Sequence, residues 1–225
     1  MKSIIVTGGT KGIGRAIVDK FAQEQYQVFT CARSEDESLK GISNVHFFKA
    51  DLSQRSDVLA FADFVRQHTE SVDILVNNTG FFIPGQIHNE EEGTLEAMIE
   101  TNVYSAYHLT RQFVNKMIEL RSGHIFNICS TASITAYTNG GSYCISKFAL
   151  LGMSKVLREE LKPFNVRVTS ILPGATLTNS WAGVDLPTER FMRSEDVAEV
   201  IWTAHKMPAS TVLEEILLRP QLGDI

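Results

Sequence analysis

Short runs of β-branched and other apolar residues alternate along the chain with longer segments of helical periodicity. The apolar runs lie at residues 4–6, 28–30, 45–48, 74–76, 124–128, 166–172 and 213–217, and they predict strands. The segments at 14–25, 55–68, 94–120 and 142–161 have apolar positions at helical spacing. This alternation predicts an α/β fold, a doubly wound (Rossmann) parallel sheet of about seven strands with helices on both faces.

The composition is that of an ordinary globular protein of one domain, and we expect that domain to span residues 1–225. The 225 residues are 44% hydrophobic and 21% charged, and they show no internal repeat or linker. The net charge of -5 argues against nucleic acid as a partner, because phosphate-binding surfaces concentrate Lys and Arg. No apolar run approaches the ~20 residues of a membrane span, and nothing resembles a signal peptide, so we expect a cytoplasmic protein without a membrane partner.

The three cysteines, Cys31, Cys129 and Cys144, form no C-x-x-C pair. We expect reduced thiols, with Cys129 and Cys144 in the wall of a pocket because each precedes or follows a residue of the predicted site. The six histidines lack metal-ligand spacing, so we predict no metal site.

Small and polar residues follow the predicted strands, where ligands bind in doubly wound sheets. The first strand runs into a glycine-rich turn, Thr-Gly-Gly-Thr-Lys-Gly-Ile-Gly at residues 7–14. Such a turn lets the backbone approach a pyrophosphate, which the N–H groups of the next helix bind. Its spacing differs from the common G-x-G-x-x-G pattern, so a turn that is glycine-rich for geometry alone stays open as an alternative.

The end of the second predicted strand indicates which dinucleotide binds. An acidic residue there binds the ribose hydroxyls of NAD, whereas an Arg accommodates the 2′-phosphate of NADP. This chain has Arg33, and Lys11 can reach the same corner. We therefore predict NADP(H) as the cofactor. The alternative is a solvated Arg33 that balances Glu35, Asp36 and Glu37.

Tyr143 and Lys147 are four residues apart on a predicted helix and share one face. The pKa of tyrosine is ordinarily about 10, which is high for proton transfer at neutral pH, and a neighbouring ammonium favours the phenolate. Ser130, directly after the fifth predicted strand, can hydrogen-bond a substrate oxygen. The pair alone also fits a tyrosine packed at an interface beside a solvated lysine.

In their order along the chain, these motifs resemble the short-chain dehydrogenase/reductase family over residues 3 to about 178. The resemblance implies a catalytic tetrad of Asn102, Ser130, Tyr143 and Lys147. It implies cofactor contacts by the turn, by the ends of the second to fourth and sixth strands, and by the tetrad helix: Gly8, Thr10, Lys11, Gly12, Ile13, Gly14, Arg33, Asp51, Leu52, Asn78, Gly80, Tyr143, Lys147, Pro173, Gly174 and Thr178. Asp51 and Leu52 would contact adenine. The central strand would be steadied by Asn77, Asn78 and Gly80. Thr178 would contact the nicotinamide carboxamide or phosphate.

The implied reaction is hydride transfer between NADP(H) and a carbonyl or secondary alcohol. Tyr143 would act as general acid/base, Ser130 would orient the substrate oxygen, and Lys147 would bind the nicotinamide ribose and favour the phenolate. Asn102 would hold a water that links Lys147 to solvent. Two alternatives are a non-catalytic NADP-binding regulatory or scaffold protein, and an epimerase or dehydratase, which generally needs a larger C-terminal region than the residues after Gly174.

The chain departs from the family pattern at a few places. Thr79 stands where Ala is usual and Cys129 where Ser is common, and both leave the reactive groups in place. The end of the sequence lacks the Gly-Gly that many members carry. It looks similar to the branch that acts on small hydroxy acids and other short polar alcohols. The family resemblance as a whole implies an NADP-preferring member of a 3-oxoacyl-reductase-like or small hydroxy-acid dehydrogenase-like branch.

The irregular segment at about 176–193 follows the predicted nicotinamide region, and we expect a short substrate lid there. Substrate contacts are open: an apolar set could line the pocket and Arg190 or Arg193 could meet an anionic substrate, but ordinary packing and solvated charge fit equally well. The apolar set is Phe81, Phe82, Ile134, Tyr137 and Trp181. The helices at 101–120 and 142–161 resemble the family's four-helix interface, which implies a homodimer or homotetramer.

Overall fold

The computed structural model describes residues 1–178, 181, 183 and 185–225. In this part of the chain, seven strands form one sheet in the order β3-β2-β1-β4-β5-β6-β7, and every neighbouring pair is parallel. The strands are β1 (Ser3–Thr7), β2 (Gln27–Ala32), β3 (Val45–Lys49), β4 (Ile74–Asn77), β5 (Gly123–Ile128), β6 (Val166–Pro173) and β7 (Glu215–Leu218). The order reverses direction between β1 and β4, so the predicted doubly wound sheet is confirmed.

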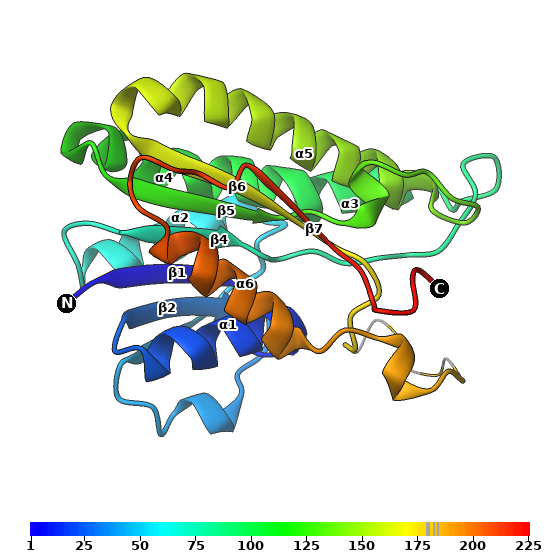
Figure 1. Cartoon of the computed structure of the whole chain (residues 1–225), viewed down its shortest axis with the longest axis horizontal. Coiled ribbons are helices and arrows are strands. Elements are labelled where there is room, and N and C mark those ends of the chain that lie inside the picture. The colour runs from blue at the N-terminus through cyan, green and yellow to red at the C-terminus, as the bar shows by residue number, and fades with distance from the viewer. Residues whose placement is uncertain (179–180, 182, 184) are drawn as a thin grey trace.

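Helices cover both faces of the sheet, as Figure 1 shows. One layer contains α1 (Gly12–Gln23) and α6 (Ser194–Lys206), which pack against each other. The other contains α2 (Arg55–Arg66), α4 (Ser105–Leu120) and α5 (Gly141–Leu161), with the short α3 (Thr94–Ile99) beside α5. Single 3₁₀ turns occupy η1 (Glu37–Leu39), η3 (Thr131–Ser133), η4 (Lys162–Phe164) and η6 (Thr188–Arg190).

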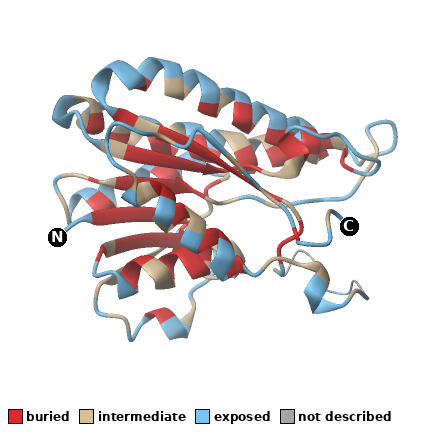
Figure 2. Cartoon of the chain, viewed as in Figure 1, coloured by how far each residue is buried: buried red, intermediate tan, exposed pale blue. Residues whose placement is uncertain are grey.

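The central strands are buried on both faces because alternate side chains enter two different cores (Figure 2). Ile4 and Val6 of β1 join a cluster with α1 and α6, whereas Ile5 joins the cluster with α2 and α4. In β5, Phe126 joins the cluster with α1 and α6, and Ile125 joins the cluster with α2 and α4. The sheet is therefore a rigid platform that fixes where each strand ends. No helix in the described residues is long and apolar enough to cross a membrane.

Two helical regions differ from the prediction. The helix α6 was not predicted from the sequence, although Val197, Ile201 and Ala204 are spaced for one buried helical face. The segment predicted to be helical over 94–120 is helical throughout, but α3 and α4 are joined by a π-helical turn, η2 (Glu100–Tyr104), which the periodicity did not indicate. The wider turn contains Asn102, whose side chain is held by hydrogen bonds described below.

Backbone hydrogen bonds join the two ends of the segment expected to form a lid. Residues 179, 180, 182 and 184 of this segment lie outside the described residues. Before them, Leu177 N–H donates to Met192 O (2.8 Å), and Met192 N–H donates to Ala175 O (2.9 Å). The two ends therefore meet, and the loop leaves and rejoins the fold at the carboxyl end of β6.

Candidate active site

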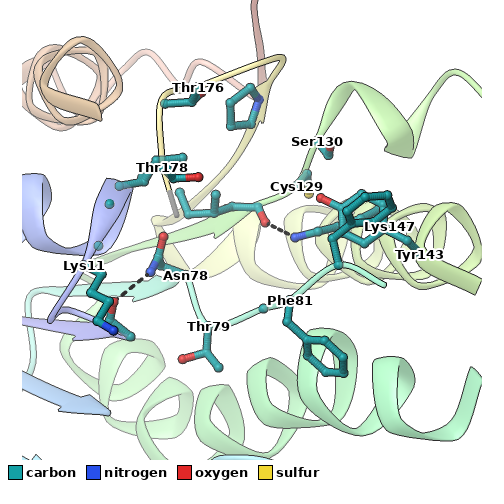
Figure 3. A pocket seen from close by; sticks show the side chains of 18 of the residues that line it. Lys11, Asn78, Thr79, Phe81, Cys129, Ser130, Tyr143, Lys147, Thr176 and Thr178 are labelled. Atoms are coloured by element: carbon teal, nitrogen blue, oxygen red, sulfur yellow. Dashed lines mark hydrogen bonds between the residues drawn. The ribbon is translucent and has the colours of Figure 1, made fainter. Parts of the chain in front are cut away.

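A cavity of about 800 Å³ lies along the carboxyl ends of the strands. Every residue that the sequence predicted to contact a cofactor lines it: Gly8, Thr10, Lys11, Gly12, Ile13, Gly14, Arg33, Asp51, Leu52, Asn78, Gly80, Tyr143, Lys147, Pro173, Gly174 and Thr178. Figure 3 shows Lys11 and Asn78 on one side of this cavity and Ser130, Tyr143 and Lys147 on another. Its volume is within the ordinary range for small-molecule and cofactor sites.

The glycine-rich turn joins β1 to α1 and requires glycine at two kinds of position. Gly12, the first residue of α1, has a φ of +51°, which side chains rarely adopt. A Cβ atom on Gly14 would lie 2.3 Å from Gly8 O and 2.4 Å from Asn78 Nδ2. The turn therefore brings the N-terminus of α1, with its unpaired N–H groups, to the cavity wall.

The loop after β4 holds this turn in place. Thr7 Oγ1 accepts hydrogen bonds from the backbone N–H groups of Asn78 and Thr79, both at 2.9 Å. In return, Asn78 Nδ2 donates to Thr7 O (2.8 Å). Asn77 lies between the sheet and α4, where its Nδ2 donates to Asn127 Oδ1 (2.8 Å) and Thr110 Oγ1 (3.1 Å). This network ties the ends of β1, β4 and β5 together.

Lys11 and Arg33 form a basic corner at the β2 end of the cavity. Both are exposed and line the cavity, and neither has a carboxylate partner among the described residues. The three acidic residues that could have neutralised Arg33 are engaged elsewhere, because Asp36 binds Arg15 (2.8 Å) while Glu35 and Glu37 bind Lys40 (3.3 and 2.7 Å). The positive charge of this corner is therefore available to an anion.

Asp51 and Leu52 follow β3 and line the same end of the cavity. Asp51 Oδ1 accepts hydrogen bonds from Ser53 N–H (3.1 Å) and Ser53 Oγ (2.9 Å). The Asp51 backbone N–H donates to Asp57 Oδ2 (2.9 Å). These bonds fix the Asp51 carboxylate at the edge of the cavity.

Lys147 and Tyr143 lie one turn apart on α5, with both side chains at the cavity (Figure 3). The lysine is buried, at 5% exposure, and its Nζ donates to Ile128 O (2.9 Å) at the end of β5. This bond holds the ammonium 5.7 Å from the centre of the Tyr143 ring. A buried ammonium needs hydrogen-bond acceptors, and here the acceptor is supplied by the strand that leads to Ser130.

Ser130 caps the 3₁₀ turn η3, directly after β5. Its Oγ accepts from Ala132 N–H (3.1 Å), and Ser133 Oγ accepts from Ser130 N–H (3.2 Å). The reciprocal bonds fix the serine in one position on the cavity wall. The Ser130 hydroxyl can donate a hydrogen bond into the cavity while its oxygen accepts the one from Ala132 N–H.

Asn102 lies in the π-helical turn behind the cavity and is not among its lining residues. Its Oδ1 accepts from Phe81 N–H (2.9 Å), and its Nδ2 donates to Phe81 O (3.1 Å) and to Ser146 Oγ (2.9 Å). A Cβ on Gly80 would lie 3.0 Å from Asn102 Oδ1 and 3.5 Å from Lys147 Nζ. Asn102 thus joins the loop after β4 to α5 beside Lys147.

The loop after β6 closes the cavity on the side opposite Phe81 and Thr79 (Figure 3). Pro173, Gly174, Thr176 and Thr178 line it. The side chain of Thr178 lies close to the first residue of α1, since a Cβ on Gly12 would be 3.0 Å from Thr178 Cγ2. This loop and the glycine-rich turn therefore form two neighbouring walls of one site.

Most of the apolar residues considered for substrate contact also line the cavity. Phe81, Phe82, Tyr137 and Trp181 do so, whereas Ile134 is exposed outside it. The Phe82 ring meets the Tyr143 ring edge-on, with centroids 4.9 Å apart.

The two arginines considered for substrate contact lie outside the lining residues. Arg190 Nη2 donates to Asp224 O (3.2 Å). Arg193 forms an ion pair with Asp196 (2.6 Å) at the start of α6.

The cysteines behave as buried thiols. Cys129 lines the cavity as expected, but Cys144 does not and packs against Gly140. Burial raises the pKa of the Cys129 thiol and raises the pKa of Cys31, also on the lining, to about 12. Neither thiol is therefore an activated nucleophile. Burial likewise raises the pKa of the Tyr137 phenol, so this second tyrosine of the cavity is a poor proton donor.

Several lining residues were not predicted from the sequence. Thr131 and Thr135 follow β5, and their position after a strand end was a usable signal. Asp224 and Ile225 come from the segment after β7. No periodicity or motif marks that segment, so only the folded chain reveals its contribution.

Comparison with known proteins indicates the family to which this chain belongs. The family model described as short chain dehydrogenase matches residues 2–187. Sepiapterin reductase of Chlorobaculum tepidum is 34% identical, covering 99% of this chain and 97% of the relative. An NADP-dependent 3-hydroxy acid dehydrogenase of Shigella flexneri is 29% identical, covering 96% and 94%.

One solved structure has a closely similar fold. An alcohol dehydrogenase of the archaeon Thermococcus sibiricus, complexed with 5-hydroxy-NADP, has a TM-score of 0.89 at 25% identity and covers 98% of this chain and 97% of that chain. On the family match and on the relative that it resembles over nearly its whole length, this chain belongs to the short-chain dehydrogenase family of oxidoreductases.

Proposed function

We propose that this protein transfers hydride between NADP(H) and a carbonyl compound or secondary alcohol, with Tyr143 as the general acid/base. The observation that carries the proposal is the buried Lys147 ammonium, which Ile128 O fixes 5.7 Å from the Tyr143 ring. A fixed positive charge beside a phenol stabilises the negative charge that forms on the phenol oxygen when its proton is transferred.

The neighbouring side chains support a role in positioning the substrate oxygen. Ser130 Oγ is held by Ala132 N–H (3.1 Å) on the wall that also contains Tyr143. Its O–H can be donated to the substrate oxygen and orient that oxygen toward the phenol. Asn102 does not line the cavity, and its hydrogen bonds to the Phe81 backbone and Ser146 Oγ hold the loop that faces Tyr143. We also propose that Asn102, next to Lys147, holds the water through which the proton is replaced.

The residues present fit a dinucleotide with an extra phosphate. The glycine-rich turn and the N-terminus of α1 suit the pyrophosphate, and the unpaired Lys11 and Arg33 suit the 2′-phosphate. Asp51 and Leu52 would contact the adenine. Lys147 would bind the nicotinamide ribose, and Pro173, Gly174 and Thr178 would lie against the nicotinamide. The bound cofactor supplies the hydride chemistry, and the chain supplies binding, orientation and the proton.

A panel of carbonyl compounds and alcohols, followed by NADPH absorbance, tests this proposal against its alternatives. An NADP-dependent oxidoreductase oxidises NADPH with some carbonyl compounds or reduces NADP⁺ with some alcohols. A non-catalytic regulatory or scaffold protein would bind NADPH and leave the absorbance unchanged with all of them. We further propose that residues 1–225 act as one domain and that the loop at 176–193 serves as the substrate lid.

We propose a homodimer or homotetramer assembled through α4 and α5. A groove between these helices is lined by apolar side chains that include Val114, Ile118, Met153 and Val156, and Val156 is 56% exposed. Such surfaces mark protein contacts, and a monomer in light scattering at micromolar concentration would contradict the proposal. We also propose a cytoplasmic location, supported by three cysteines that are buried and free.

A further inference from the structure

The segment after β7 returns to the cavity at the end of β6. Gly174 N–H donates to Leu218 O (2.8 Å), which fixes the end of β7 beside the end of β6. A turn closed by Gly223 N–H to Pro220 O (2.9 Å), with Gly223 at a φ of +83°, then reverses the chain. Asp224 and Ile225 consequently line the cavity on the side of Gly174, far from the basic corner at β2.

Two arginines from different elements converge on Asp224. Arg219 Nε donates to Asp224 Oδ2 (2.7 Å), and Arg190 Nη2 donates to Asp224 O (3.2 Å). Arg190 belongs to η6 in the loop at 176–193 and precedes Phe191, whose ring lies 5.1 Å from that of Trp181. Asp224 therefore connects the chain end with the loop that carries Trp181.

We propose that Ile225 limits the size of the substrate group that fits at the β6 end of the cavity, and that the Arg190–Asp224–Arg219 contacts position Ile225. The inference rests on the proposed function, and it concerns which substrates enter and not how they react. Ile225 and Trp181 are apolar, Arg190 and Arg219 do not line the cavity, and the Asp224 carboxylate, which does line it, is paired with Arg219 (2.7 Å). The group bound there is accordingly an apolar substituent on an uncharged carbonyl compound.

The test of Ile225 compares two uncharged diketones of different size, 2,3-butanedione and 1-phenyl-1,2-propanedione, with NADPH as reductant. Ile225→Ala should raise the ratio of kcat/KM for the larger over the smaller diketone by about tenfold, and Ile225→Val by less, since removed methyl groups open the site. Arg193→Gln is the matched control, because Arg193 is the last residue of the same loop and pairs with Asp196 away from the cavity. An unchanged ratio in Ile225→Ala would overturn the proposal.

The positioning role is tested by a double-mutant cycle on the same ratio. Arg219→Gln and Asp224→Asn each break the ion pair and leave the Asp224 carbonyl for Arg190, so we expect each to raise the ratio through KM for the larger diketone, with kcat nearly unchanged. The double variant should add nothing further, because both single changes remove one interaction. Additive effects, or a fall in kcat that tracks a lower melting temperature, would show a merely structural role.

Failure of this inference and failure of the proposed function give different results. If the wild-type protein oxidises NADPH with the diketones and the Ile225 variants keep its selectivity, only the inference is contradicted. If NADPH is not oxidised with any carbonyl compound, the proposed function is contradicted and the inference fails with it.

Discussion

The Lys147 ammonium donates a hydrogen bond to Ile128 O at 2.9 Å, so the last carbonyl of β5 fixes the charge that faces Tyr143. The same strand end leads into Ser130, two residues later. One backbone segment therefore fixes both the Lys147 ammonium and Ser130, and the helix α5 carries Lys147 and Tyr143. Small movements of β5 relative to α5 would change all of these distances together.

Replacing Lys147 by Met tests the role of that charge. The change keeps most of the side-chain volume but removes the ammonium, so we expect kcat/KM to fall by about 10²–10⁴-fold. The dissociation constant for NADPH should also rise, because Lys147 is proposed to bind the nicotinamide ribose. The control is Lys155→Met on the same helix, an exposed lysine paired with Glu215 at 3.0 Å. A kcat/KM of Lys147→Met within a few-fold of the wild-type value would contradict this role.

Arg33 and Lys11 should determine the choice between NADPH and NADH. Charge-assisted hydrogen bonds contribute about 1.5–3 kcal/mol each, so Arg33→Ala should lower the kcat/KM ratio of NADPH over NADH by about 10–100-fold. Lys11→Ala should lower it in the same direction. Arg66→Ala, at an exposed arginine paired with Asp63 at 2.8 Å, should leave the ratio unchanged. Equal use of the two cofactors by the wild-type protein would refute the NADP assignment.

Asn102 should contribute to stability as well as activity. Asn102→Ala leaves the Phe81 N–H, the Phe81 carbonyl and Ser146 Oγ without a bond to this residue. Unsatisfied buried groups cost about 1–3 kcal/mol, and we expect a loss of that order in urea unfolding, together with a lower kcat. Glu100→Gln, at an exposed position of the same π-helical turn, is the control. Full stability in Asn102→Ala would show that its hydrogen bonds are replaced by water.

The opposite end of the sheet predicts how stability depends on pH. Burial lowers the pKa of His205 to about 4, with Arg167, Lys2 and Lys206 adding to the shift, and burial with Arg167 and His205 lowers the pKa of His124 well below its ordinary value. His205 Nε2 lies 3.1 Å from Tyr26 Oη, and His124 Nε2 lies 2.8 Å from Thr169 Oγ1. Both histidines are therefore neutral in the folded state where the unfolded chain takes up protons.

It follows that the free energy of unfolding should fall as pH drops from about 6.5, the ordinary pKa of histidine, toward 4, and the contribution of His205 should level off below that value. His205→Gln should flatten this slope, and His88→Gln, at an exposed histidine, should not. Denaturant unfolding at a series of pH values measures both. A slope that His205→Gln leaves unchanged would assign the pH dependence to other groups.

The sheet and the cofactor side of the site were predictable because they depend on local patterns. Alternating apolar runs predict β1 to β7 to within a few residues, and Gly12 and Gly14 stand where backbone geometry admits little else. In a parallel sheet the carboxyl ends of the strands meet at one edge, so the amino-acid sequence alone places Asp51, Asn78 and Ser130 in the same region.

Other features depend on contacts between distant segments. The π-helical turn at Asn102 accompanies a bond to Phe81, which no helical periodicity reveals. Asp224 reaches the cavity because Arg190 and Arg219 hold it, and neither pairing has a sequence signature. The helix α6 is a different case, since its apolar spacing and its first-turn Glu195 and Asp196 were readable in the sequence.

The measurement that tests the central claim most directly is NADPH oxidation by Tyr143→Phe, made alongside NADPH binding by fluorescence. The change removes only the phenolic oxygen and keeps the ring that packs 4.9 Å from Phe82. We predict that turnover with a reactive carbonyl compound is lost to the background rate, while the dissociation constant for NADPH stays within a few-fold of wild type. Substantial turnover in this variant, with the cofactor bound normally, would contradict the role of Tyr143 as the general acid/base.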